Sequence, residues 1–244
     1  MLKIGILDAL SPNVADIDWG GEPADTYIRF FDTVNAPFEF NTYRVALGEL
    51  PATPLECDAY LITGSINGVY DEEGWITELS QFIRECYLAN KKLVGICFGH
   101  QMLAYSLGGQ VEKSEKGENF GLARFELSKY REWMAEQVDS LSLHFVHQDQ
   151  IISLPANAVC LGGNSFCPIA LFEIENRVLG IQGHPEFSRK IMLDILPFIK
   201  ENIHAENYEK FAASLYSDEP DSRQVAKWIA NFLTQDSKVV SKKE

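Results

Sequence analysis

One cysteine of this sequence stands in a turn that favours chemistry. Cys97 lies between Gly95 and Gly99 in the segment GICFG, after a strand-like apolar run and before a helix-like run. A nucleophile at such a strand-to-helix turn has a strained backbone conformation, for which small neighbours make room. The unpaired N–H groups and the positive dipole end of the following helix favour a thiolate over a thiol. The turn therefore predicts that Cys97 is a nucleophile.

A cysteine nucleophile needs a histidine base and a group that orients this base. An apolar, strand-like segment runs into Gly183, His184, Pro185 and Glu186. Because residues two apart in an extended chain point to the same side, Glu186 can accept a hydrogen bond from one imidazole nitrogen while the other faces Cys97. Pro185 stiffens the spacing. The competing interpretation is that the His-Pro-Glu segment is an ordinary turn. The nucleophile-like turn at Cys97 favours the catalytic interpretation of the segment.

The remaining four histidines are weaker candidates for the base. His100 follows the cysteine turn on the new helix and is too near along the chain to turn back easily onto Cys97. His144 and His147 lie in a polar stretch, LHFVHQDQ, which we interpret as a loop. His204 lies at a polar helix end and is expected at the surface.

The elements predicted around these residues alternate between strands and helices through about the first hundred residues. This alternation indicates βαβ units, a mostly parallel central sheet and helices on both of its faces. The expected fold class is thus α/β. The predicted strands are 2–9, 38–46, 57–65 and 93–97, and the predicted helices are 24–35, 75–92 and 99–109.

The middle of the chain has a different pattern. Between Gln110 and Ile181 we expect a small addition of short, antiparallel strands, and two helices then close the fold. With no internal repeat and no linker, we expect one domain over residues 1–235 and a flexible tail over 236–244. The predicted strands are 123–127, 158–163, 169–176 and 178–182, and the predicted helices are 189–203 and 222–235.

The composition excludes several classes of function. Thirty-five acidic residues against 21 basic ones give a net charge of −14, which argues against a protein that follows a nucleic-acid backbone. No apolar run reaches the length of about eighteen residues that a membrane span requires. The N-terminal segment lacks a signal-peptide pattern, so we expect a cytoplasmic protein.

The cysteines do not predict a disulfide framework or a zinc site. There are five of them, an odd number, with irregular spacing and no CxxC pair. Cys57, Cys86, Cys160 and Cys167 lie in apolar or periodic surroundings and are expected to pack as small hydrophobic side chains. The sequence also has no GxxxxGK[ST] phosphate loop. We therefore expect neither a metal nor another cofactor.

Together, three segments resemble the class I (triad-type) glutamine amidotransferase domain. GICFGHQMLAYSLGG is similar to the family's nucleophile motif, GIQGHPEF to its H-P-E motif, and LITGSINGVYD to its glycine-rich oxyanion loop. The resemblance extends over roughly residues 2–200. It implies a flavodoxin-like fold and a reaction on glutamine or γ-glutamyl amides through a γ-glutamyl thioester on Cys97. His184 would be the base and Glu186 the residue that orients it.

The resemblance also implies an oxyanion hole and a substrate-binding segment. The amides of Ser65 and Phe98 would form the oxyanion hole, with Gly64 making the turn. The loop here is Thr-Gly-Ser where Gly-Gly-Pro is usual, and FVHQDQI departs from the usual Ser-His-Gly-Asp. The residues implied to hold the glutamyl part of the substrate are Gln101, Val146, His147, Gln148 and Asp149.

The leaving group is left open. Release of ammonia would make the protein a glutaminase that serves a separate synthase subunit. Release of a peptide or another amine would make it a stand-alone γ-glutamyl hydrolase. The Thr-Gly-Ser loop resembles stand-alone members related to plant γ-glutamyl peptidases and to "GMP synthase-like" amidotransferases, which favours the second. A catalytically silent binding or regulatory module, a cysteine hydrolase of the redox-chaperone or peptidase type, and a purely structural role also stay open.

Overall fold

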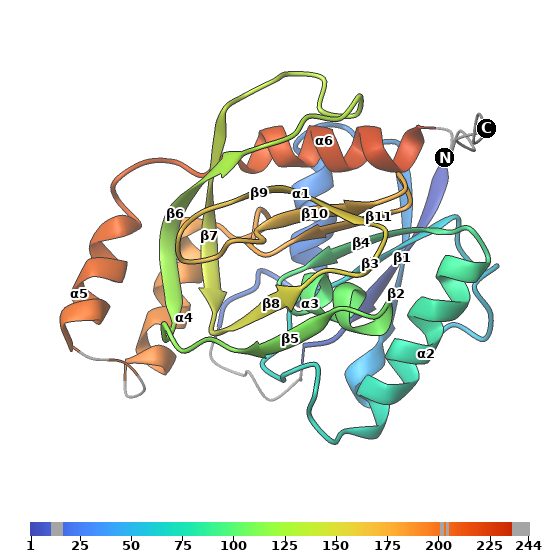
Figure 1. The fold of residues 1–244 in the computed structure, drawn as a ribbon, viewed down its shortest axis with the longest axis horizontal. Helices are drawn as coiled ribbons and strands as arrows, with labels where there is room; N and C mark the ends of the chain where they lie inside the picture. The colour runs from blue at the N-terminus through green and yellow to red at the C-terminus, as the bar shows by residue number, and fades with distance from the viewer. Residues whose placement is uncertain (11–16, 201–202, 204, 236–244) are drawn as a thin grey trace.

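A nine-stranded sheet runs through the centre of the protein (Figure 1). The computed structural model describes residues 1–10, 17–200, 203 and 205–235. Five adjacent strands of the sheet are parallel, and the other four continue it with antiparallel pairing. In sheet order the strands are β2 (Phe38–Arg44), β1 (Leu2–Asp8), β3 (Ala59–Ile62), β4 (Lys92–Ile96), β11 (Val178–Ile181), β10 (Leu171–Ile174), β9 (Ala158–Gly163), β6 (Asn119–Leu127) and β7 (Ser140–His147).

Helices cover both faces of this sheet and bury two separate apolar clusters. On one face, α1 (Asp25–Asp32) and α6 (Ser222–Thr234) pack against each other and contribute side chains to the first cluster. On the other face, α2 (Gly74–Leu88) and α3 (Phe98–Ser106) pack against each other and bury the second. The central strands are buried on both sides, as in parallel sheets generally, which explains their nearly continuous apolar sequences.

The remaining elements lie at the margin of the main sheet. β5 (Gln110–Lys113) and β8 (Asp149–Ser153) form a separate antiparallel pair. α4 (Arg189–Ile199) and α5 (Ala205–Ser214) lie beside β6 and β7 at the left of Figure 1. A third, smaller apolar cluster holds α4 and α5 together.

The predicted α/β fold with a mostly parallel sheet and an antiparallel addition is confirmed. The interpretation of 143–150 as a loop was wrong, because 143–147 belong to β7 and 149–150 belong to β8. In β7, Leu141, Leu143 and Phe145 alternate into the core while the strand pairs along its length with β6. The polar residues at its end hid this alternation.

The helix α5 was also not predicted. Its few apolar residues pack against neighbouring elements, as Phe211 does against Phe120 of β6, with ring centroids 5.7 Å apart.

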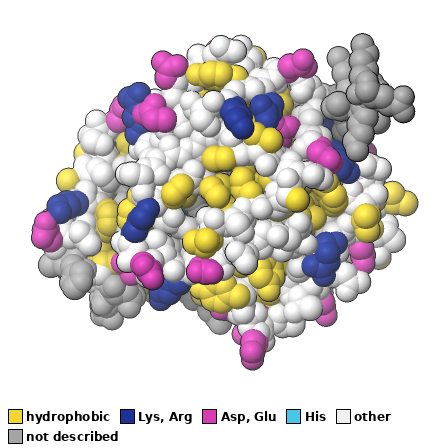
Figure 2. Space-filling view, viewed as in Figure 1, with side chains coloured by type: hydrophobic (Ala, Val, Ile, Leu, Met, Phe, Trp, Pro, Cys, Tyr) yellow, Lys and Arg dark blue, Asp and Glu magenta, His cyan; other side chains and the backbone are white. Residues whose placement is uncertain are grey.

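The tail 236–244 and His204 lie outside the described residues. None of the described helices has the length and apolar character that crossing a bilayer requires. On the face shown in Figure 2, basic side chains are scattered among acidic ones.

Candidate active site

Cys97 occupies the sharp turn between β4 and α3. Its backbone has φ 53° and ψ −105°, a conformation that residues other than glycine rarely adopt. The Cys97 N–H donates to the Ile181 carbonyl oxygen at 2.9 Å, which ties the turn to β11. A Cβ at Gly95 would lie 2.3 Å from the Gly99 oxygen, and one at Gly99 would lie 2.2 Å from the Ile62 oxygen. Both flanking glycines are therefore required by close backbone packing.

His184 lies in the segment that follows β11 (Val178–Ile181), next to this turn. Its Nδ1 lies 2.7 Å from Oε1 of Glu186, and its backbone N–H donates to the His144 carbonyl oxygen at 2.7 Å. A Cβ added at Gly64 would lie 2.9 Å from Cε1 of His184 and 3.8 Å from Cβ of Cys97. The structure thus brings Cys97, His184 and Glu186 together, with Gly64 between the first two.

The charges around His184 favour its protonated form. Burial by itself lowers the pKa of His184, but the Glu186 carboxylate and the directly interacting Cys97 outweigh it and raise the pKa to about 10. All three side chains are buried, and His184 is 4% exposed. In this low-dielectric setting a paired thiolate and imidazolium are stabilised by each other.

Two aromatic side chains fix this arrangement. Phe187 stacks on the His184 ring, with centroids 4.0 Å apart and planes 9° apart. The hydroxyl of Tyr27, on α1, accepts a hydrogen bond from the Gly64 N–H at 3.2 Å. Burial and the nearby Glu186 carboxylate raise the pKa of Tyr27 well above its usual range. Tyr27 therefore stays neutral and connects the loop at Gly64 with the Glu186 side of the site.

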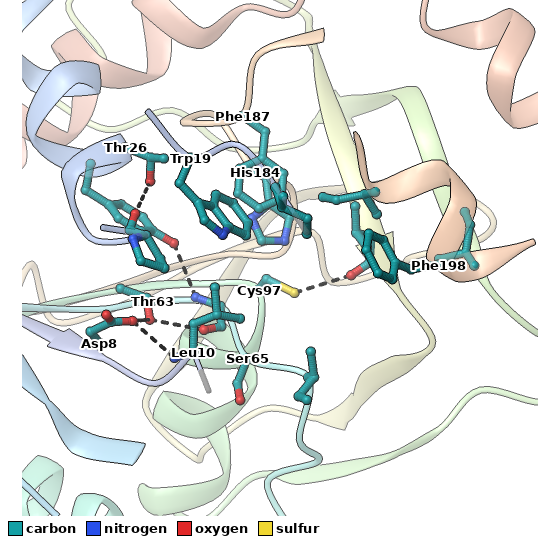
Figure 3. Close-up of a pocket in the computed structure, with 18 residues that line it drawn as sticks. Asp8, Leu10, Trp19, Thr26, Thr63, Ser65, Cys97, His184, Phe187 and Phe198 are labelled. Carbon is teal, nitrogen blue, oxygen red and sulfur yellow. Dashed lines mark hydrogen bonds between the residues drawn. The ribbon is translucent and has the colours of Figure 1, made fainter. Parts of the chain in front are cut away.

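The loop expected to form the oxyanion hole is anchored to the end of β1. The Ala9 N–H donates to the Thr63 hydroxyl at 2.8 Å, and that hydroxyl lies 3.5 Å from the Asp8 carboxylate. Phe98 is the first residue of α3, where backbone N–H groups lack intrahelical acceptors. Ser65 lies near Cys97 with its hydroxyl turned away from the sulfur (Figure 3).

A cavity of about 360 Å³ opens directly onto Cys97 and His184 (Figure 3). Gly64, Ser65 and Val146 also line it. Most of the other lining side chains are apolar, and many of them come from the segment around Trp19 and from α4. A space of this size can hold a small substrate.

Four of the residues expected to bind the glutamyl part do not line this cavity. Gln101 donates to the Asp149 carbonyl oxygen at 2.8 Å and to the Gln182 side chain at 3.0 Å. The carbonyl oxygen of Gln148 accepts from the Ser114 N–H at 3.2 Å. Only Val146 of the five lines the cavity, and its carbonyl oxygen lies 3.7 Å from Sγ of Cys97.

His147 makes its hydrogen bonds within the protein. Its Nδ1 lies 3.0 Å from the Asp149 carbonyl oxygen, and its Nε2 lies 3.1 Å from the Asn119 amide nitrogen. A carbonyl can only accept and an amide nitrogen can only donate, so the proton is on Nδ1. Burial lowers the pKa of His147 to about 4. The ring is thus neutral and stabilises the β7–β8 corner.

Sequence patterns did not indicate Tyr27 or Trp19 as parts of the site. Tyr27 belongs to the apolar pattern of its helix, which predicts packing and not a hydrogen bond to a loop from another part of the chain. The adjacency of Phe187 to the H-P-E segment was the one available signal for the aromatic ring on His184.

These features define a cysteine-histidine-glutamate arrangement on a doubly covered α/β sheet. The family model for class-I glutamine amidotransferases matches residues 29–196. Gamma-glutamyl peptidase 2 of Arabidopsis thaliana is 32% identical over 207 residues, 80% of this chain and 82% of that protein. A glutamine amidotransferase of Thermotoga maritima superposes with a TM-score of 0.73 at 20% identity, over 95% of this chain and 96% of the other.

A part of a longer relative is also similar. GMP synthase of Clostridium acetobutylicum is 28% identical over 172 residues, 70% of this chain and 32% of that protein. The chain belongs to the class I glutamine amidotransferase family. It is an enzyme of the amide-hydrolysing kind that this family comprises.

Proposed function

We propose that the protein hydrolyses γ-glutamyl amides through a γ-glutamyl thioester on Cys97, with His184 as the acid and base and Glu186 as its orienting partner. One observation carries the proposal. The strained cysteine at the end of β4 interacts directly with a buried histidine that holds a carboxylate at 2.7 Å. This arrangement supplies a nucleophile and a base that line one cavity, with an orienting carboxylate bonded to the base.

The reaction follows from these groups. The Cys97 sulfur attacks the γ-carbonyl carbon, and the carbonyl oxygen becomes negative. Backbone N–H groups at Phe98 and Ser65 stabilise this oxygen, each by about 2–4 kcal/mol. His184 then protonates the leaving amine nitrogen, and the C–N bond breaks to give the thioester. Water attacks the thioester as His184 takes its proton, which releases glutamate and restores the thiol.

Gly64 holds the loop of the oxyanion hole in position. Its N–H donates to the Tyr27 hydroxyl, so in this conformation Ser65 remains the proposed donor from this loop. The glutamyl α-amino and α-carboxylate groups are proposed to lie toward the segment 146–149. Its polar backbone borders the Cys97 sulfur through the Val146 carbonyl oxygen.

The physiological reaction is proposed to be that of a stand-alone γ-glutamyl hydrolase. The similarity to gamma-glutamyl peptidase 2 over most of both chains supports this. The similarity to one part of a GMP synthase favours a second candidate, a glutaminase that supplies ammonia to a separate synthase.

The five cysteines are all free, which supports the predicted cytoplasmic location.

The test is mass spectrometry of purified wild type and Cys97→Ala with L-glutamine and, separately, γ-glutamyl peptides. Release of amine or ammonia that depends on Cys97 is expected. Cys97→Ala removes one buried sulfur, so the fold should persist and circular dichroism should match the wild type. Equal turnover by the folded variant would contradict the proposal. Peptide cleavage with little glutaminase activity identifies the stand-alone hydrolase, and the reverse identifies the glutaminase.

A further inference from the structure

The cavity has an apolar wall that begins on the face of His184. Phe187 stacks on the imidazole, and Trp19 packs on Phe187 with ring centroids 5.7 Å apart. Ile195 and Phe198 of α4 complete this wall. In Figure 3, Trp19 and Phe187 lie against His184, and Phe198 lies on the other side of the Cys97 sulfur. We call Trp19, Phe187, Ile195 and Phe198 the apolar wall.

The charged end of a γ-glutamyl group does not fit against this wall. That end carries an α-ammonium and an α-carboxylate, and burying either without a polar partner is costly. Among the described residues that line the cavity there is no lysine or arginine, and Asp8 is the one carboxylate. Asp8 belongs to the end of β1 and not to the wall.

The chemistry places the leaving amine beside the wall. His184 must reach the amine nitrogen to protonate it, so the substituent on that nitrogen lies next to the imidazole. One face of the imidazole is covered by Phe187, and the wall continues from there to Trp19. An amine substituent at this place contacts aromatic and aliphatic side chains.

We propose that the apolar wall is the subsite for the released amine and that it selects amines with an apolar substituent, aliphatic or aromatic. This inference rests on the proposed function, because it assigns the amine half of the same substrate. Phe198 is 46% exposed, so an apolar substituent covers surface that ammonia leaves in water. Each methylene buried there strengthens transition-state binding by about fourfold.

The test compares L-glutamine with three γ-glutamyl amides, those of ethylamine, butylamine and 2-phenylethylamine. These primary amines have similar basicity, so differences in rate report contact and not leaving-group reactivity. From the ethylamide to the butylamide, kcat/KM should rise about sixteenfold, since two further methylenes are buried. The phenylethylamide should be at least as good as the butylamide, and glutamine should be the poorest substrate.

A matched pair of variants locates the selectivity. Phe198→Ser should bring the butylamide-to-ethylamide ratio of kcat/KM close to one. Leu193→Ser alters an exposed residue of the same helix that does not line the cavity, so it should keep the wild-type ratio. Because the readout is a ratio within one preparation, a partly folded variant still gives a valid result.

The outcomes separate this inference from the function on which it rests. Failure of wild type to hydrolyse any of the four compounds would contradict the proposed function itself. Turnover of all four with no increase from the ethylamide to the butylamide, or with glutamine preferred, would overturn only the apolar subsite. A wild-type ratio in Phe198→Ser would overturn the role of the wall.

Discussion

Two buried histidines, His184 and His147, have opposite electrostatic surroundings. His184 lies in the segment that follows β11 and is 4% exposed. His147 is the last residue of β7 and is 6% exposed. The pKa of His184 is raised to about 10, and that of His147 is lowered to about 4. Burial is nearly equal, so burial alone does not distinguish them.

The difference comes from the partners of the two rings. His184 faces the Glu186 carboxylate and the Cys97 sulfur, and both raise its pKa. His147 faces a carbonyl oxygen and the amide of Asn119, which carry no net charge. A charged partner thus favours the protonated form of a buried histidine, whereas neutral partners leave the ring uncharged.

Replacing His184 should give the largest effect. His184→Gln removes the group that accepts and returns the proton, and kcat/KM should fall by at least ~10⁴-fold. Steady-state kinetics with a γ-glutamyl amide give the value, and thermal unfolding verifies the fold. A loss no greater than that of the same change at His147 would erase the distinction between the two rings.

Glu186→Gln should have the next largest effect, a loss of about 10³-fold, since the base stays in place without its charged partner. The sign of the pH effect follows from the pKa. The carboxylate raises the pKa of His184, so a neutral amide lowers it. His184 must be protonated to release the amine, and the wild-type rate should decline only as the pH approaches about 10.

In the variant this alkaline decline should move to lower pH. The pH profile of kcat/KM measures it. A profile with the same alkaline limb as the wild type would mean that Glu186 does not set the charge of His184.

Gly64→Ala should displace the His184 ring. The added Cβ would lie 2.9 Å from Cε1, and a shift of about 1 Å in a catalytic group costs about 10²-fold in rate. Gly74→Ala is the matched control, because its Cβ would meet nothing within 4 Å and the residue begins α2. Kinetics of both variants test this, and equal activity would show that His184 tolerates displacement.

His147→Gln should have the smallest effect on catalysis. Glutamine can keep one of the two hydrogen bonds, so the melting temperature should drop by a few degrees, corresponding to about 1 kcal/mol. The kcat should change by less than about threefold, because a neutral ring outside the cavity moves no proton. Calorimetry and kinetics measure the two quantities. A large loss of kcat with little loss of stability would contradict the structural role.

The sequence predicted the parts of the molecule that depend on local pattern. The apolar runs of β1, β3, β4 and β11 and the helical spacing of α2 are visible in any short window of the chain. The glycines around Cys97 also belong to this class, because a tight backbone turn restricts the residue types next to it.

What the sequence did not predict depends on contacts between distant segments. The hydrogen bond from Gly64 to Tyr27 joins residues 37 apart, and the apolar wall joins Trp19 to α4. The bond from Asn119 to His147 crosses two paired strands, which the polar segment LHFVHQDQ did not indicate. No local pattern contains such information.

The most direct measurement is the imidazole ¹⁵N NMR spectrum of the wild type and of Cys97→Ala as a function of pH, with signals assigned from His184→Gln and His147→Gln. We predict a protonated His184 at pH 7.5 that titrates near 10, a lower pKa of His184 in Cys97→Ala, and a His147 that is neutral above about 4. A neutral His184 at pH 7.5, or one that titrates unchanged without the thiol, would contradict the triad.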